Sequence, residues 1–206
     1  MTDALAEAVG RDVSRETCAL LNRYAALLRD ESAKQNLVAR STLDSLWQRH
    51  ILDSAQLVRF EPAPGASWVD IGSGAGLPGI VIAALVDGPV LLIEPRRLRA
   101  DFLVRVIREL GLGPRVSVAA ERVERVRGTF DVLTARAVAA LDKLLEISTH
   151  LSTRKSLWVL PKGRSAQSEL ADTRAKWQCD VVSVPSSTDP ESEILLLSAV
   201  KARGGR

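Results

Sequence analysis

The sequence predicts an α/β fold with a doubly wound, mostly parallel, seven-stranded sheet and a helical cap at its N-terminus. From residue 68 onward, short apolar strands alternate with amphipathic helical stretches, which is typical of βαβ units with parallel strands. Before residue 62, apolar residues instead recur at helical spacing. We therefore expect one domain over 1–206, in which a cap over 1–62 packs on a Rossmann-like core over 66–202.

The cap is expected to contain two helices. The first covers residues 12–31, where the apolar side chains share one face and the charges occupy the other. The second covers residues 41–60, with Ser41 or Thr42 as its N-cap. The sequence PAPG at 62–65 then ends helical structure before the first strand.

The core is expected to alternate strands and helices up to its last two strands. The first strand begins at Trp68, and the others cover 90–93, 115–119, 130–135, 156–160, 181–184 and 193–201. The helices cover 80–86, 98–110, 141–151 and 165–177. The tail at 203–206 is expected to be disordered.

A glycine-rich turn follows the first strand, in the sequence DIGSGAGLPG at 70–79. Glycines adopt positive φ angles and let backbone N–H groups approach a ligand without interference from a Cβ atom. These N–H groups precede a helix, whose N-terminus favours an anion. In S-adenosylmethionine that anion is the methionine carboxylate, and Asp70 can meet the ammonium group directly or through water. The turn therefore predicts a ligand site at the edge of the sheet.

The end of the next strand narrows the choice of ligand. Glu94 lies 24 positions after Asp70, where a carboxylate accepts hydrogen bonds from both ribose hydroxyls of a nucleoside. The pattern G-x-G-x-x-G at 74–79 also fits a dinucleotide such as NAD. The acidic strand end before the glycines and the helical cap before the motif favour S-adenosylmethionine. A glycine-rich turn without a ligand is the remaining alternative.

Two further segments follow the third and fourth strands. Val123 and Glu124 come after the third strand and are expected against the adenine, with a solvated, charged helix start as the alternative. Arg136 leaves the fourth strand, where the transferred methyl group would point. It is interpreted either as a clamp on the substrate or as an ion-pair partner at the sheet edge.

Composition restricts the function only broadly. The net charge of +3 is too small to indicate nucleic-acid binding by itself, and the preference for arginine over lysine is most simply explained by GC-rich codons. Two cysteines and two histidines, with no CxxC pattern, predict free thiols and no metal site. The polar N-terminus and the lack of a long apolar run predict a soluble, cytoplasmic protein without membrane contact.

Four segments occur together in a characteristic order: RHILDS at 49–54, the glycine motif, RAVA at 136–139, and Lys162-Gly163. With them the chain resembles the bacterial 16S ribosomal RNA guanine-N7 methyltransferases, the glucose-inhibited division protein B family, over residues 20–200. The glycine motif is common among methyltransferases, whereas its extension LPG at 77–79 combined with RHILDS is specific. The resemblance implies a class I S-adenosylmethionine-dependent methyltransferase fold. It also implies a substrate, 16S ribosomal RNA in the small ribosomal subunit.

The resemblance also implies site residues. Gly72 and Leu77 match cofactor contacts at the turn, Val123 and Glu124 match those at the adenine, and Arg136 matches the position near the methyl group. With the turn and strand ends, the predicted cofactor-binding set is Asp70, Gly72, Gly74, Gly76, Leu77, Glu94, Val123, Glu124 and Arg136. The candidate catalytic residues are Arg136, His50 and Lys162, on a chain expected to act as a monomer.

The chemistry of guanine N7 explains why no base or nucleophile is evident in the sequence. N7 carries an exposed lone pair, so catalysis consists of in-line positioning and of stabilising the charge that moves onto the purine. Arg136 is the first candidate to hold O6 or a phosphate. The alternative for His50 and Lys162 is a bond to a backbone group or a carboxylate. The resemblance implies that Arg49 and Asp53 border the active-site mouth, and the alternative is that they form a pair on a helix surface.

Two other functions are considered. A small-molecule methyltransferase would use the same cofactor. An NAD-dependent oxidoreductase is disfavoured, because no hydride-relay motif is evident and Tyr24 is the only tyrosine. Basic residues near the second helix of the core and beyond the later strands are candidates for phosphate contacts, with a solvated charged face as the alternative. They are Arg96, Arg97, Arg99, Arg105, Arg108, Arg122, Arg125, Arg127, Lys162 and Arg164.

Overall fold

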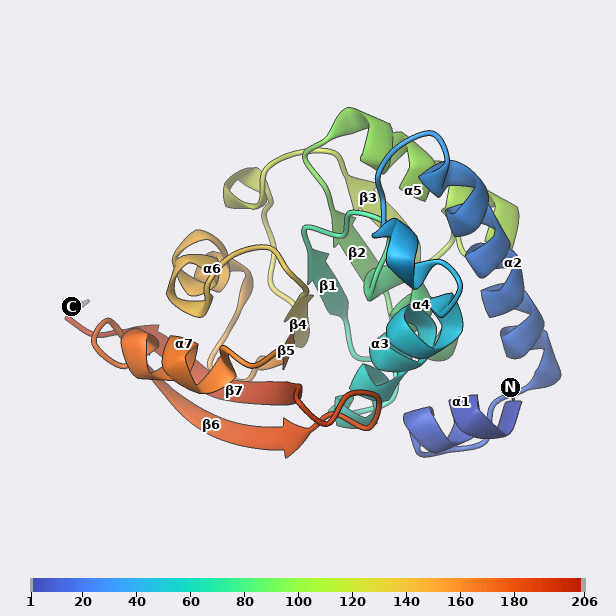
Figure 1. The fold of residues 1–206 in the computed structure, drawn as a ribbon. Helices are drawn as coiled ribbons and strands as arrows, with labels where there is room; N and C mark the ends of the chain where they lie inside the picture. The colour runs from blue at the N-terminus through green and yellow to red at the C-terminus, as the bar shows by residue number, and fades with distance from the viewer. Residues whose placement is uncertain (1, 205–206) are drawn as a thin grey trace.

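The computed structural model describes residues 2–204, except for the side chain of Arg40. In this part of the chain, seven strands form one sheet in the order β3-β2-β1-β4-β5-β7-β6 (Figure 1). The strands are β1 (Trp68–Ile71), β2 (Val90–Ile93), β3 (Val116–Ala119), β4 (Val132–Ala135), β5 (Leu157–Lys162), β6 (Trp177–Pro185) and β7 (Glu193–Ala202). The predicted seven-stranded α/β sheet is confirmed.

The topology places a crevice at the centre of the sheet. Strands β1 to β5 pair in parallel, and β7 is antiparallel to both of its neighbours. From β1 the chain moves outward through β2 and β3, and then returns to build β4 and β5 on the other side. Ligands of open α/β sheets bind beyond the carboxyl ends of the strands at such a reversal. Here the reversal lies between β1 and β4.

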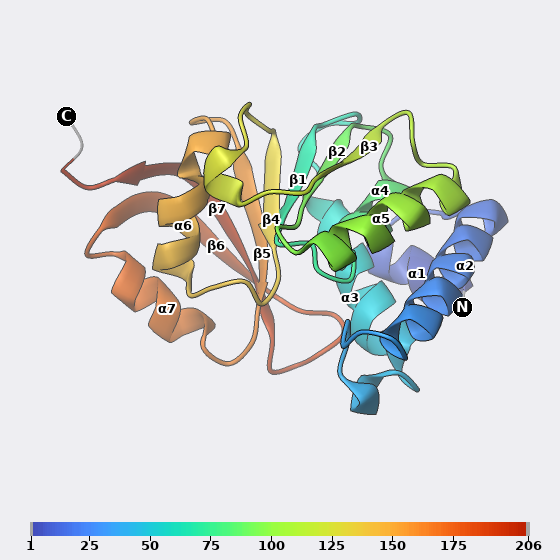
Figure 2. The same ribbon diagram turned by 90° about the horizontal axis from the view of Figure 1, so that it is seen from above.

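Helices cover both faces of this sheet (Figure 2). One hydrophobic core contains Trp68 and Leu92 from the strands together with side chains from α2 (Arg15–Ser32), α4 (Gly79–Leu85) and α5 (Arg97–Leu110). The second core contains Ile71 and Trp158 together with side chains from α6 and α7. The core helices are α4 (Gly79–Leu85), α5 (Arg97–Leu110), α6 (Leu141–Ser148) and α7 (Ala166–Thr173), with 3-10 turns at Val123–Arg125 and Thr149–Leu151.

The N-terminal segment packs on the α4 and α5 side of the sheet. Helix α2 (Arg15–Ser32) is capped by Ser14, whose hydroxyl accepts the backbone N–H of Thr17. The helix α1 (Thr2–Val9) was not predicted, although Leu5 and Val9 are buried in the same core as the strands. The predicted bounds of the cap, 1–62, stay a prediction.

The predicted helix over 41–60 is wrong as one continuous helix. The structure instead has a 3-10 turn (Arg40–Thr42), a π-helical stretch (Trp47–Leu52), α3 (Asp53–Ala55) and a 3-10 turn (Gln56–Phe60). Thr42 does not cap it, because its hydroxyl donates to Ala39 O at 2.7 Å and lies 2.9 Å from His50 Nε2. π-Helical turns are often found at functional sites.

The helix predicted over 165–177 ends earlier than expected. It ends at Thr173, and Trp177 already pairs with Ala202 as the first residue of β6. A single buried tryptophan satisfies the spacing of a helix and of a strand, so the apolar pattern alone does not separate them. In the tail that was expected to be disordered, Gly205 and Arg206 lie outside the described residues, whereas the Arg203 N–H donates to Lys176 O.

Candidate functional site

The turn between β1 and α4 packs against Tyr24 of α2 and Ile80 of α4. Gly72, Gly74 and Gly76 all have positive φ angles, as the motif predicts. From α2, the Tyr24 hydroxyl donates to Ala75 O at 2.8 Å. A Cβ atom on Gly76 would lie 2.6 Å from Ile80 Cγ1 and 3.1 Å from the Tyr24 hydroxyl. Gly76 is therefore needed for packing of the loop against the helices.

Replacing Gly76 with alanine should destabilise the fold by about 3 kcal/mol, because strain from a positive φ angle adds to an overpacked contact. Gly111 also has a positive φ angle, but a Cβ atom there would meet nothing within 4 Å. Gly111→Ala should therefore cost only about 1 kcal/mol. Urea unfolding of both variants measures the difference, and equal losses would contradict the packing role of Gly76.

Asp70 is buried inside the protein. Its side chain is 1% exposed, and its Oδ2 accepts the backbone N–H of Gly79 at 3.0 Å. Burial raises the pKa of Asp70 to about 6, against the effect of its hydrogen bonds. Its Oδ1 is buried without a hydrogen-bond partner among the described residues. A direct contact between Asp70 and the cofactor stays a prediction.

A cavity of about 600 Å³ opens beyond the ends of β1 and β2, next to the glycine turn. Its size falls in the usual range for small-molecule sites. Four of the predicted cofactor residues line it: Gly72, Glu94, Val123 and Glu124. The structure thus brings together predicted residues that follow three different strands.

Glu94 is prepared to accept further hydrogen bonds inside this cavity. It is 3% exposed, and its Oε2 accepts the Gly74 N–H while its Oε1 accepts the Arg96 N–H, both at 2.9 Å. Each carboxylate oxygen has two lone pairs, so each keeps one for a ribose hydroxyl. The two backbone bonds fix the plane of the carboxylate.

The other walls of the cavity also suit an adenosine-containing cofactor. A Cβ atom on Gly72 would lie 2.7 Å from Val138 Cγ2, so there is no space for a side chain at this position. Val123 adds a buried apolar surface, and Arg99 is a further lining residue. The residues present therefore fit the methyl donor that the sequence predicts. Gly74, Gly76, Leu77 and Arg136 are not among the residues that line this cavity.

A second, smaller cavity of about 130 Å³ lies beyond the ends of β4 and β5. Arg136, Lys162 and Asp53 line it. The next two residues after Arg136, Ala137 and Val138, line the large cavity instead. The segment 136–138 therefore separates the two cavities, and Ala137 has a φ angle of +56°, which is unusual for a residue with a side chain.

Lys162 is paired in this structure. Its Nζ lies 2.8 Å from Glu169 Oε2, and the same oxygen accepts the N–H of Leu141 at the start of α6. Burial raises the pKa of Glu169, but the hydrogen bonds from Lys162 and Ser165 outweigh it and lower the pKa overall. The carboxylate thus holds the ammonium group beside the small cavity.

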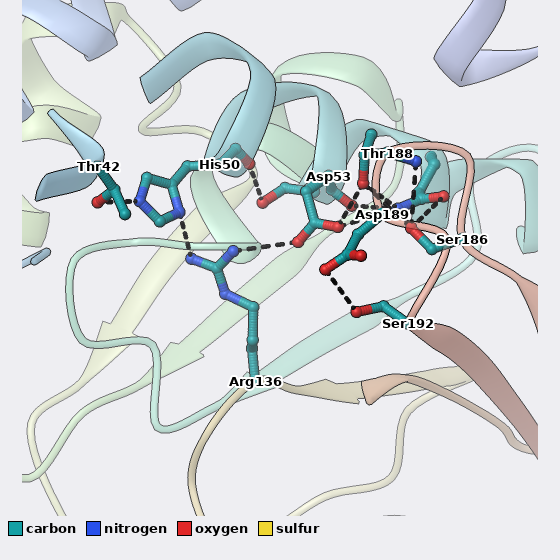
Figure 3. A network of polar contacts seen from close by, with 10 residues as sticks. Thr42, His50, Asp53, Arg136, Ser186, Thr188, Asp189 and Ser192 are labelled. Atoms are coloured by element: carbon teal, nitrogen blue, oxygen red, sulfur yellow. Dashed lines mark hydrogen bonds and ion pairs between the residues drawn. The ribbon is translucent and has the colours of Figure 1, made fainter. Parts of the chain in front are cut away.

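Arg136 connects the core to the cap. Its Nη1 lies 3.2 Å from Asp53 Oδ2, and its Nη2 lies 3.5 Å from His50 Nδ1 (Figure 3). The His50 Nε2 meets the Thr42 hydroxyl at 2.9 Å. Asp53 therefore pairs with Arg136 across 83 positions of sequence, and this ion pair at the sheet edge is one of the two predicted interpretations of Arg136.

Burial, with Arg136 as the next cause, lowers the pKa of His50 to about 4 from its ordinary value of 6.5, although Asp53 opposes the shift. The folded state therefore resists protonation of His50 while the unfolded state does not. Stability is then independent of His50 above pH 6.5 and falls as the pH drops from 6.5 to 4. We expect the wild type to lose stability relative to His50→Gln across this window, as measured by urea midpoints. Parallel pH profiles would contradict this expectation.

The sequence analysis did not identify the polar residues that contact Asp53, the ion-pair partner of Arg136. Gln56 and the loop 186–192 between β6 and β7 surround Asp53. One signal was present in the sequence, because Gln56 stands among buried apolar residues in the segment 51–58. A polar side chain at such a position requires partners.

Sequence comparison identifies the family. A family model described as rRNA small subunit methyltransferase G (GidB) matches residues 17–195. The chain belongs to this family. The resemblance predicted from the motifs is confirmed, and so is the class of enzyme, a methyltransferase. Membership leaves no support for the NAD-dependent oxidoreductase.

Relatives of the GidB family match most of this chain. The ribosomal RNA small subunit methyltransferase G of Rhizorhabdus wittichii is 47% identical over 93% of this chain and 90% of its own length. That of Zymomonas mobilis is 44% identical over 91% of this chain and 88% of its own length.

Solved structures show the same fold. A TehB-like SAM-dependent methyltransferase from Corynebacterium glutamicum has a TM-score of 0.58 at 13% identity, over 83% of this chain and 97% of its own. A mutant of MtNAS in complex with S-adenosylmethionine has a TM-score of 0.58 at 20% identity, over 84% and 72% of the two chains. The predicted class I methyltransferase fold is confirmed.

No helix among residues 2–204 has the length and the apolar character needed to span a membrane. Within the same range, no group of three or more His, Cys, Asp or Glu side chains is arranged to hold a metal ion.

Proposed function

We propose that this protein transfers a methyl group from S-adenosylmethionine to N7 of a guanine in 16S ribosomal RNA of the small ribosomal subunit. The observation that carries the proposal is the pair of cavities on either side of the segment 136–138. One cavity suits the donor, and the other offers polar groups for an acceptor base. GidB family membership supports the ribosomal RNA of the small subunit as the substrate.

The large cavity would hold the methyl donor. S-Adenosylmethionine supplies, when bound, an electrophilic methyl group on a sulfonium centre. Glu94 would accept the ribose hydroxyls, Val123 and Glu124 would lie against the adenine, and Gly72 would leave room for the donor. Gly74, Gly76 and Leu77 would shape the turn, and Asp70 would stabilise the ammonium side from beneath it.

The small cavity would hold the acceptor guanine. Its N7 needs no deprotonation, so the site needs hydrogen-bond donors that hold O6 and orient N7 in line with the methyl group. Arg136 and Lys162 line this cavity and would be these hydrogen-bond donors. His50 would act on Arg136 and not as a base, because its lowered pKa of about 4 makes it a weak proton acceptor and its Nδ1 faces Arg136.

Methylation of isolated small subunits tests this function. The protein would be incubated with a labelled methyl donor and small subunits from cells that lack the gene, followed by mapping of the label in 16S ribosomal RNA. We expect one labelled guanine, sensitive to cleavage chemistry specific for N7-methylguanine. Label in a metabolite pool and none in the RNA would favour a small-molecule methyltransferase instead. We also propose that the protein acts as a cytoplasmic monomer.

A further inference from the structure

The loop between β6 and β7, residues 186–192, reaches across to the cap below α3 (Figures 1 and 3). Gln56 anchors it there, although 130 positions separate Gln56 from Ser186. The Gln56 side chain is 2% exposed, and its Oε1 accepts the backbone N–H of Ser187 at 2.8 Å. Its Nε2 donates to the Ser186 hydroxyl at 3.0 Å. The loop is therefore bound to the cap by a buried amide.

The same loop holds Asp53 through a hydroxyl group. Thr188 Oγ1 donates to Asp53 Oδ1 at 2.8 Å, and Gln56 Nε2 donates to the same oxygen at 3.1 Å. The other oxygen, Oδ2, faces Arg136 Nη1 at 3.2 Å. One carboxylate thus connects the loop to the guanidinium, and Figure 3 shows Asp53 between Arg136 and Thr188.

This arrangement restricts how Arg136 can lie. Two donors on Oδ1 fix the rotation of the Asp53 carboxylate, so that Oδ2 stays aimed at the guanidinium. The side chains of Asp53 and Arg136 are only 20% and 22% exposed, so water competes weakly for the pair. An arginine otherwise has many rotamers, and each hydrogen bond that is already in place reduces the entropy lost on binding a substrate.

We propose that Thr188 and Gln56 are positioning residues, which orient Arg136 through Asp53 and make the β6–β7 loop a working part of the acceptor site. This inference rests on the proposed function, since Arg136 has to contact the acceptor base for its orientation to affect methyl transfer. It assigns the loop a role in turnover and none in binding of the methyl donor.

Thr188→Val tests the proposal, because valine keeps the shape of threonine and removes only the hydroxyl. We expect kcat for methylation of small subunits to fall about tenfold, as misplacement of a reacting group predicts. KM for small subunits should change less, and the affinity for S-adenosylhomocysteine should stay unchanged. Thr188→Ser, which keeps the hydroxyl, should restore kcat. Thr153→Val, in the exposed turn that precedes the amino end of β5, is the matched control.

A measurement without turnover keeps this test separate from the proposed function. Rotation about the Arg136 Nε–Cζ bond, followed by NMR on protein with labelled arginine, should be slow in the wild type and faster in Thr188→Val. Unchanged rotation, or a wild-type kcat in Thr188→Val, would overturn the positioning role. A wild type that labels no ribosomal RNA would instead refute the proposed function, and the rotation rates would still decide how Arg136 is oriented.

Discussion

Substitution of Gly72 with aspartate is expected to weaken binding of S-adenosylhomocysteine by more than about 100-fold while the chain remains folded. The new Cβ atom would lie 2.7 Å from Val138 Cγ2, on a backbone with a φ angle of +71°. The new carboxylate would stand in the same cavity as Glu94, where a second negative charge repels the amino-acid carboxylate of the ligand. Steric and electrostatic effects therefore act in the same direction.

Isothermal titration calorimetry measures this loss, with circular dichroism as the check on folding. Gly113→Asp adds the same charge in a turn where a Cβ atom meets nothing within 4 Å, and it should bind like the wild type. Gly72→Ala separates the two causes, because it adds the methyl group without the charge. Retained affinity in Gly72→Asp would show that the donor binds elsewhere.

The alternation of strands and helices could be predicted because parallel strands buried on both faces are nearly continuous apolar runs. VLLI at 90–93 is β2, and its two faces enter the two different cores. The cap was harder to predict. Its segment over 41–60 has the apolar content of a helix, but it folds as a series of 3-10, π-helical and α-helical stretches, and apolar spacing does not distinguish these turn types.

The two halves of the site differ in how far they could be predicted. Gly72 and Glu94 stand at strand ends, and parallel pairing of β1 with β2 brings strand ends together, so the sequence predicts their common cavity. Thr188 lies in a loop after the last crossover, 135 positions from Asp53. No local pattern encodes that contact, because it depends on the antiparallel β6–β7 hairpin returning the loop to the cap.

Arg136→Lys is expected to lower kcat for methylation of small subunits by about 100-fold, at an unchanged affinity for S-adenosylhomocysteine. Lysine keeps the charge but lacks the planar fork that meets Asp53 and His50 at the same time. Arg136 lines the small cavity and not the large one, so the loss should appear in turnover. Single-turnover rates at saturating donor measure it, with Arg154→Lys in the exposed turn before β5 as the control.

The pair of Asp53 and Arg136 should behave as one unit in these rates. Asp53→Asn keeps the size of the side chain and removes the charge that holds the guanidinium at 3.2 Å. If Asp53 acts only through Arg136, the double variant should be no slower than Arg136→Lys alone. Arg136→Lys already removes the Asp53–Arg136 interaction, so Asp53→Asn has nothing further to remove. If the loss of kcat in the double variant instead equals the product of the two single losses, Asp53 contacts the acceptor itself. In that case the carboxylate would be a specificity element for the purine and not a support for the arginine.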